Sequence, residues 1–222
     1  MTLFNSQDGF KAFEKLSKSQ PGSINGFALD DLAWERFILE DGNLDANREK
    51  DDMIPVCAKL CGGLQGASVL ELGPYEGYYS VALEAEGVEG NLSIEGNPAN
   101  FLKCLVVKNH YNLNRTRYML GDLTQYLANS QEKYDFILAS GVLYHLFEPY
   151  AALENIIAKT NRFGVCTTYY HPEIQLFKFT GNTRTVNFPG LEPLVLHERF
   201  NSSVVPGKKH GVNSTAWMFG LD

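Results

Sequence analysis

The sequence predicts an α/β fold with a mostly parallel central sheet and helices on both of its faces. From Ser68 onward, short apolar runs alternate with segments of helical period, a pattern typical of successive βαβ units. Polar and glycine-containing motifs follow the apolar runs. Crossovers in such folds are right-handed, and ligands bind outside the carboxyl ends of the strands. The functional residues are therefore expected where the predicted strands end.

Each element of the sheet follows from its local pattern. Strands are expected at residues 68–72, 91–95, 117–121, 134–140 and 164–169. The helices between them are expected at residues 77–85, 99–109, 123–129 and 149–160. An amphipathic helix at 53–61, which Gly62 and Gly63 end, precedes the first strand.

The chain divides into a core and two flanking parts. Residues 1–52 are expected to form an N-terminal extension or cap, with a helix at 7–16, a loop at 17–25 and an aromatic and aliphatic cluster at 34–39. Residues 53–170 form the core. Residues 171–222 either face the substrate or are an incomplete end of the fold. Their first part, 171–190, carries prolines and glycines without a helical period and is expected to be irregular.

Composition excludes several classes of protein. Of the 222 residues, 44% are hydrophobic and 20% are charged, which is typical of a globular protein and not of a disordered or fibrous one. The formal net charge of −7 argues against nucleic acid as the main partner, because phosphates are bound by clustered Lys and Arg. No apolar run approaches the length that spans a bilayer.

The cysteines indicate a reducing compartment, and we expect a cytoplasmic protein. Four cysteines are sparse for this length and lack the spacing of a disulfide framework. Cys57 and Cys61 lie four positions apart on a predicted helix, but neither a second pair nor a nearby His accompanies them. We interpret them as core residues and predict no metal site.

A glycine-containing turn follows the first predicted strand. In the segment 69–77, Glu71 ends the strand, and Gly73 and Gly77 flank Tyr75 in the turn to the helix. A dinucleotide fold would have G-x-G-x-x-G, so that bare amides and a helix N-terminus meet a pyrophosphate. Here the spacing is E-x-G-x-x-x-G. Taken alone, it also fits a structural turn of any α/β protein, but an acidic residue at this place suits a cationic ligand without phosphates.

Acidic residues also end the next two predicted strands. Glu95, followed by Gly96 and Asn97, is placed to accept the hydroxyl protons of a ribose, although an isolated Glu there is more often a solvated acid. Asp122, between Gly121 and Leu123, is placed to accept from an adenine amine or to cap the following helix, and the sequence does not choose between these two roles.

The fourth strand end completes the series. The strand 134–140 runs through Ser140 into Gly141, Val142 and the pair Tyr144–His145. Four strand ends thus bear polar groups in the order that binding of S-adenosylmethionine would require.

Together these residues resemble the class I S-adenosylmethionine-dependent methyltransferase superfamily, which has a Rossmann-like fold. The turn 141–146, GVLYHL, is similar to that of a branch that includes tRNA wobble-uridine modifying enzymes. The resemblance implies that the segment around 34–48 closes over the cofactor. It also implies that the cofactor-binding residues are Glu71, Gly73, Tyr75 and Gly77 on the methionine side, Glu95, Gly96 and Asn97 at the ribose, Gly121, Asp122 and Leu123 at adenine, and Ser140, Gly141 and Val142 beneath the cofactor.

The C-terminal part departs from the superfamily pattern. Residues 194–200 and 215–221 are candidates for its closing antiparallel pair. Alternatively, residues 213–218 resemble the segment that precedes the last helix in relatives, and the fold then lacks its final strands. We favour this second interpretation slightly.

The predicted reaction is transfer of a methyl group to a small-molecule acceptor. The sulfonium is already a good leaving group, so a base is needed only if the acceptor must lose a proton. His145 is the best-placed base and Tyr144 is placed to orient the acceptor, whereas a hydrogen-bonded imidazole that only stabilises the turn is an equally good interpretation of His145.

Other functions fit less well. A non-catalytic module would retain cofactor binding, or only the architecture, and bind a partner; the three acids Glu71, Glu95 and Asp122 argue against loss of cofactor binding. A nicotinamide-dependent oxidoreductase would need the dinucleotide glycine spacing. A tRNA-modifying enzyme would need basic residues near the site. Arg115 and Arg117 are expected at the start of the third strand, opposite the ligand edge, and Lys208–Lys209 lie in a loop whose position the sequence does not predict.

Overall fold

The computed structural model describes residues 34–40, 43–46 and 52–168 and three strands of the C-terminal part, β8 (Thr183–Val186), β9 (Leu194–Glu198) and β10 (Thr215–Met218). The helix expected at 7–16, the loop at 17–25 and the pair Lys208–Lys209 lie outside these residues. Among the helices in the described ranges, none is long and apolar enough to cross a membrane.

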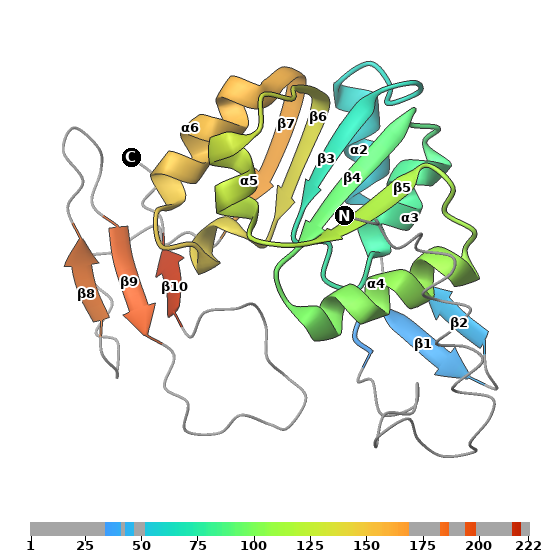
Figure 1. Ribbon diagram of the computed structural model, residues 1–222, viewed down its shortest axis with the longest axis horizontal. Helices are drawn as coiled ribbons and strands as arrows, with labels where there is room; N and C mark the ends of the chain where they lie inside the picture. The colour runs from blue at the N-terminus through green and yellow to red at the C-terminus, as the bar shows by residue number, and fades with distance from the viewer. Residues whose placement is uncertain are drawn as a thin grey trace, which may run out of the picture.

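A five-stranded parallel sheet forms the centre of the molecule (Figure 1). Its strands are β3 (Ser68–Leu72), β4 (Gly90–Glu95), β5 (Thr116–Leu120), β6 (Tyr134–Ser140) and β7 (Thr160–Thr167). They lie in the order β5-β4-β3-β6-β7, and every pair is parallel. The predicted α/β, Rossmann-like fold is thereby confirmed.

Helices cover both faces of this sheet. Successive side chains along a strand point to opposite faces, and apolar side chains project from both of them. The helices are α2 (Met53–Leu60), α3 (Tyr78–Ala85), α4 (Pro98–His110), α5 (Leu123–Asn129) and α6 (Pro149–Lys159). Val69 of β3 packs with α2 and α3, whereas its neighbour Leu70 packs with α5 and α6. Figure 1 shows α5 and α6 on one side of the sheet and α2 and α3 on the other.

A hairpin of β1 (Phe37–Glu40) and β2 (Asn43–Ala46) precedes the core. Phe37 is buried against Val107 of α4 and Leu113, and Trp34 and Tyr78 pack beside it. Part of the predicted cap is thus attached to α4, close to the turn that follows β3.

The last strands form a separate three-stranded sheet in the order β10-β9-β8. The two candidate segments do pair, since Thr215 of β10 lies opposite Glu198 of β9, but they pair in this separate sheet and not as the closing strands of the central one. The other partner of β9 is β8, which lies in the stretch 171–190 that was predicted to be irregular. That prediction was wrong for residues 183–186. β7 also begins at Thr160, directly after α6, rather than at 164.

Candidate functional site

A cavity of about 900 Å³ opens at the carboxyl ends of β3, β4, β5 and β6. This is the edge at which an open α/β sheet binds ligands, and the volume lies in the range of small-molecule sites. The cavity brings together twelve of the predicted site residues: Gly73, Tyr75, Glu95, Gly96, Gly121, Asp122, Leu123, Ser140, Gly141, Val142, Tyr144 and His145.

Three predicted site residues, Glu71, Gly77 and Asn97, are not among those that line the cavity. Gly77 adopts φ +82° as the N-cap of α3, and a Cβ there would lie 2.6 Å from the Tyr118 hydroxyl, so the fold itself requires this glycine. Asn97 caps α4, where its side chain accepts from the N–H groups of Ala99 and Asn100.

Glu71 is buried beneath α3, with 1% of its surface exposed. Strand alternation turns it to the same face as Val69, toward α3 and away from the cavity. Its Oε2 accepts from Ser80 of α3, from Ser93 of β4 at 2.6 Å and from Asn91 of β4 at 3.1 Å. Burial raises the pKa of this carboxyl group.

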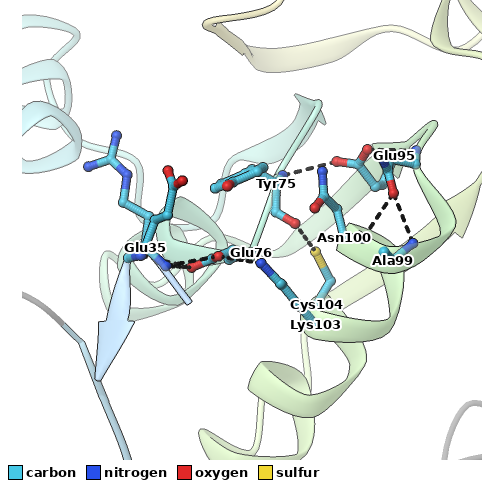
Figure 2. Close-up of polar contacts among 10 residues, drawn as sticks. Glu35, Tyr75, Glu76, Glu95, Ala99, Asn100, Lys103 and Cys104 are labelled. Carbon is cyan, nitrogen blue, oxygen red and sulfur yellow. Dashed lines mark hydrogen bonds and ion pairs between the residues drawn. The ribbon is translucent and has the colours of Figure 1, made fainter. Parts of the chain in front are cut away.

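The turn after β3 is shaped by two residues with positive φ. Gly73 adopts φ +66°, and a Cβ there would lie 2.8 Å from Cγ2 of Val142, so no larger residue fits. Tyr75 adopts φ +60°, which is uncommon for a residue with a side chain. Its N–H donates to Glu95 at 3.0 Å, and its carbonyl accepts from the Cys104 thiol at 3.4 Å (Figure 2). The turn is therefore held from both sides.

Glu95 is a buried carboxylate, 6% exposed, that still reaches the cavity. Oε1 accepts from the N–H of Asn97 at 2.8 Å, and Oε2 accepts from the N–H of Tyr75. Burial raises the pKa of Glu95, and the backbone donors partly offset this rise. Each oxygen retains acceptor capacity for a further donor, so the carboxylate can receive two neighbouring hydroxyl groups.

Asp122 is the N-cap of α5, as one of its two interpretations predicts. Its Oδ1 accepts from the Thr124 N–H at 2.8 Å, the Thr124 hydroxyl at 2.6 Å and the Gln125 N–H at 3.4 Å. The hydrogen bond from the Thr124 hydroxyl is the main cause that lowers the pKa of Asp122. The residue also lines the cavity, next to Gly121, where an added Cβ would have no atom within 4 Å.

The turn after β6 carries the predicted catalytic pair. Gly141, at φ +70°, donates its N–H to the Thr167 hydroxyl at 3.0 Å. Tyr144 and His145 lie in the short 3-10 helix η2 (Leu143–His145), with ring centroids 4.2 Å apart, and both line the cavity. β10 packs beside η2, which brings the C-terminal sheet to this end of the site.

Sequence reasoning missed several lining residues because distant segments supply them. Several of them carry no motif: Asn100, buried on α4, Phe147 and Glu148, directly before α6, and Asn155, within α6. Glu35 and Arg36 line the cavity from the segment before β1. Only the resemblance, which implied closure by residues around 34–48, indicated this segment.

Comparison with known proteins identifies the family. Residues 44–175, more than half of the chain, match the model of a methyltransferase domain family. The chain belongs to this family. The methyltransferase domain is a member of the class I S-adenosylmethionine-dependent superfamily, and its family is catalytic. No curated protein matches the sequence.

Solved structures support the fold. The N-terminal domain of EvdMO1, solved with S-adenosylhomocysteine and in the presence of D-fucose, has a TM-score of 0.59 at 18% identity, covering 96% of this chain and 82% of that one. The same domain with S-adenosylhomocysteine alone also has a TM-score of 0.59, at 16% identity over the same shares of the two chains. The whole of EvdMO1 has a TM-score of 0.53 at 20% identity, covering 78% of this chain and 38% of that one.

The described residues fit S-adenosylmethionine, the cofactor of the family. Glu95 offers a carboxylate that lines the cavity and whose two oxygens retain acceptor capacity. Gly121 leaves open space beside it that a side chain would occupy. The turn after β3 also lacks the G-x-G-x-x-G spacing that a pyrophosphate would need.

Proposed function

We propose that this methyltransferase transfers a methyl group from S-adenosylmethionine to a small acceptor that is neutral or cationic. The charge of the cavity carries the proposal. Glu35, Glu95, Asp122 and Glu148 line it, and Arg36 is the one Arg or Lys among the described lining residues. Such a field attracts cations and repels a polyanion. Glu71 and Glu76 are buried and do not contribute to the charge of the cavity.

The order of the strands suggests how the cofactor lies. Glu95 ends β4 and would hold the ribose, while Gly121 and Asp122 follow the edge strand β5 and would face adenine. The turn after β3, with Gly73 and Tyr75, would then meet the methionine part. Residues 140–142 follow β6 and would lie beneath the reacting end.

The acceptor would enter beside η2. The cofactor supplies an activated methyl group, so the protein needs mainly to orient the nucleophile and exclude water from it. Tyr144 would orient the acceptor, and His145 would take its proton where the nucleophile must lose one. The position of β10 next to η2 supports a role of residues 171–222 in enclosing the acceptor, and Glu35 and Arg36 in the lining support a cap role for residues 1–52.

The cytoplasm is the compartment we propose. All four cysteines are free thiols without a disulfide, and Cys57 and Cys104 are buried. A reducing compartment keeps cysteines in this thiol form.

Methyl transfer to defined acceptors tests the function. The purified chain would be incubated with methyl-labelled S-adenosylmethionine and, separately, with a panel of small amines, a panel of sugars that includes D-fucose, and bulk tRNA. We expect label in at least one small molecule, abolished or strongly reduced by Tyr144→Ala. Label in tRNA, together with sub-micromolar and salt-sensitive tRNA binding, would contradict the proposal, since it requires a basic surface near the cavity.

A further inference from the structure

A buried ion pair lies directly behind the turn after β3. The Nζ atom of Lys103 on α4 is 2.7 Å from Oε1 of Glu76, and the two side chains are 7% and 0% exposed. The Lys103 ammonium group also lies over the rings of Trp34 and Tyr75, 5.6 Å and 5.3 Å from their centroids. A charge pair this deep costs desolvation energy, and transfer of an activated methyl group does not require it.

The carboxylate of Glu76 binds the segment before β1 as well as Lys103 (Figure 2). The N–H of Glu35 donates to both oxygens of Glu76 at 3.1 Å, and the N–H of Arg36 donates to Oε2 at 2.8 Å. Glu35 and Arg36 are themselves exposed, so their backbone is anchored from inside while their side chains stay at the surface. Hydrogen bonds to a charged acceptor are the stronger kind.

The anchored residues present opposite charges to one part of the cavity. Both line it together with Gly73, Pro74 and Tyr75 of the turn after β3. The Arg36 guanidinium lies over the rings of Tyr78 and Tyr79, 5.6 Å and 5.7 Å from their centroids, which directs it along α3. A neighbouring carboxylate and guanidinium match a zwitterion, and the free amino-acid end of S-adenosylmethionine carries an ammonium and a carboxylate group.

We propose that the Glu76–Lys103 pair is a positioning element that docks residues 34–36 onto the core and thereby sets Glu35 and Arg36 as the site for the zwitterionic amino-acid end of the cofactor. The proposal rests on the proposed function and deepens it. It also explains why Glu71 is not needed at the methionine side: Glu35 supplies the negative charge there. The turn after β3 connects Glu95 with residues 34–36. The N–H of Tyr75 donates to Glu95, and the adjacent residue Glu76 accepts from the N–H of Arg36.

Two ligands separate the amino-acid end from the rest of the cofactor. S-Adenosylhomocysteine carries that end, whereas 5′-methylthioadenosine has the same nucleoside and sulfur without it. The double variant Glu76→Gln/Lys103→Met removes both buried charges while keeping side-chain length, which avoids leaving one charge unpaired. The double variant Glu35→Gln/Arg36→Gln removes only the surface charges. Lys159→Met is the matched control, because Lys159 is also a buried lysine but bonds the Ser130 carbonyl at the far end of α6.

We expect both double variants to weaken S-adenosylhomocysteine binding at least about tenfold in calorimetry, which corresponds to about 1.4 kcal/mol, and to change 5′-methylthioadenosine binding less than about twofold. Lys159→Met should change neither. Equal losses for the two ligands, no loss for S-adenosylhomocysteine, or an equal loss in Lys159→Met would each overturn the proposal.

Amide hydrogen exchange of the free protein tests the docking independently of any ligand. The amides of residues 35 and 36 should exchange slowly in the wild type and at least about tenfold faster, relative to the core amides of β4, in the Glu76→Gln/Lys103→Met variant. Unchanged exchange at these two amides would overturn the docking. If the wild type binds neither ligand but the exchange result holds, the proposed function fails and the docking stands.

Discussion

Replacing Glu95 by glutamine should weaken cofactor binding without unfolding the methyltransferase. The carboxylate holds the N–H groups of Tyr75 and Asn97 and lines the cavity, where we assign it to the ribose. Glutamine keeps the size of the side chain but turns one acceptor into a donor and removes the charge. A hydrogen bond to a charged group contributes about 1.5–3 kcal/mol, so the dissociation constant of S-adenosylhomocysteine should rise about ten- to 150-fold.

This variant should lose some stability but remain folded. One backbone N–H loses its acceptor, which costs about 1–3 kcal/mol. The loss is offset in part because the variant no longer buries a carboxylate whose pKa is raised by desolvation. Thermal unfolding measured beside the calorimetry would show whether the folded state is retained.

Glu71→Gln is the matched control for this experiment. Glu71 is also a buried strand-end glutamate, on the neighbouring strand β3, but it does not line the cavity. Its substitution should leave S-adenosylhomocysteine affinity within about twofold, well under the 1.4 kcal/mol of a tenfold change. Equal affinity losses in the two variants, or an unchanged dissociation constant in Glu95→Gln, would refute the assignment of Glu95 to the ribose.

Three further predictions follow from individual side chains. Burial raises the folded-state pKa of Glu71, so the folded protein binds the proton of this carboxyl group more tightly than the unfolded chain does. The free energy of unfolding of the wild type should therefore fall as the pH rises above about 4.3, the ordinary pKa of Glu. Denaturant titrations of Glu71→Gln should show a smaller fall. Gly121→Val has room for its side chain and no positive φ, so it should fold normally and yet lose at least about tenfold in cofactor affinity, about 1.4 kcal/mol; unaltered calorimetry would place adenine elsewhere. Asp122→Ala should cost about 1 kcal/mol of stability through loss of the α5 cap, whereas Asp122→Asn should retain it, and weaker binding in both variants would support a contact with adenine as well.

The core of the fold could be predicted because its signals are local. The alternation of apolar runs and helical segments from Ser68 to residue 168 depends only on neighbours along the chain, and the sheet matches it within a few residues. The glycines at 73, 77 and 141 have positive φ, as tight turns require. The C-terminal strands were predicted less well, since β8 lies among residues whose prolines and glycines conceal a strand.

The candidate site could be predicted only where it lies at strand ends. Twelve of the named residues line the cavity because the carboxyl ends of parallel strands meet at one edge. Glu71 does not, although it also ends a strand, because its direction depends on which face α3 covers. The residues at 35 and 36 were not assigned individually, since their contact with Glu76 joins positions about forty apart and leaves no periodic trace.

The sequence by itself determined the type of chemistry, because the identities of the strand-end residues and the glycine spacing exclude a pyrophosphate and favour a cationic nucleoside cofactor. Tertiary structure alone decided which acids serve the ligand. Burial places Glu71 in a network with Ser80 and Ser93, brings Glu95 to the cavity, and pairs Glu76 with Lys103 beneath the cap segment. A carboxylate's role depends on the solvent, donors and charges around it, and these come from segments that are far apart in the chain and adjacent only after folding.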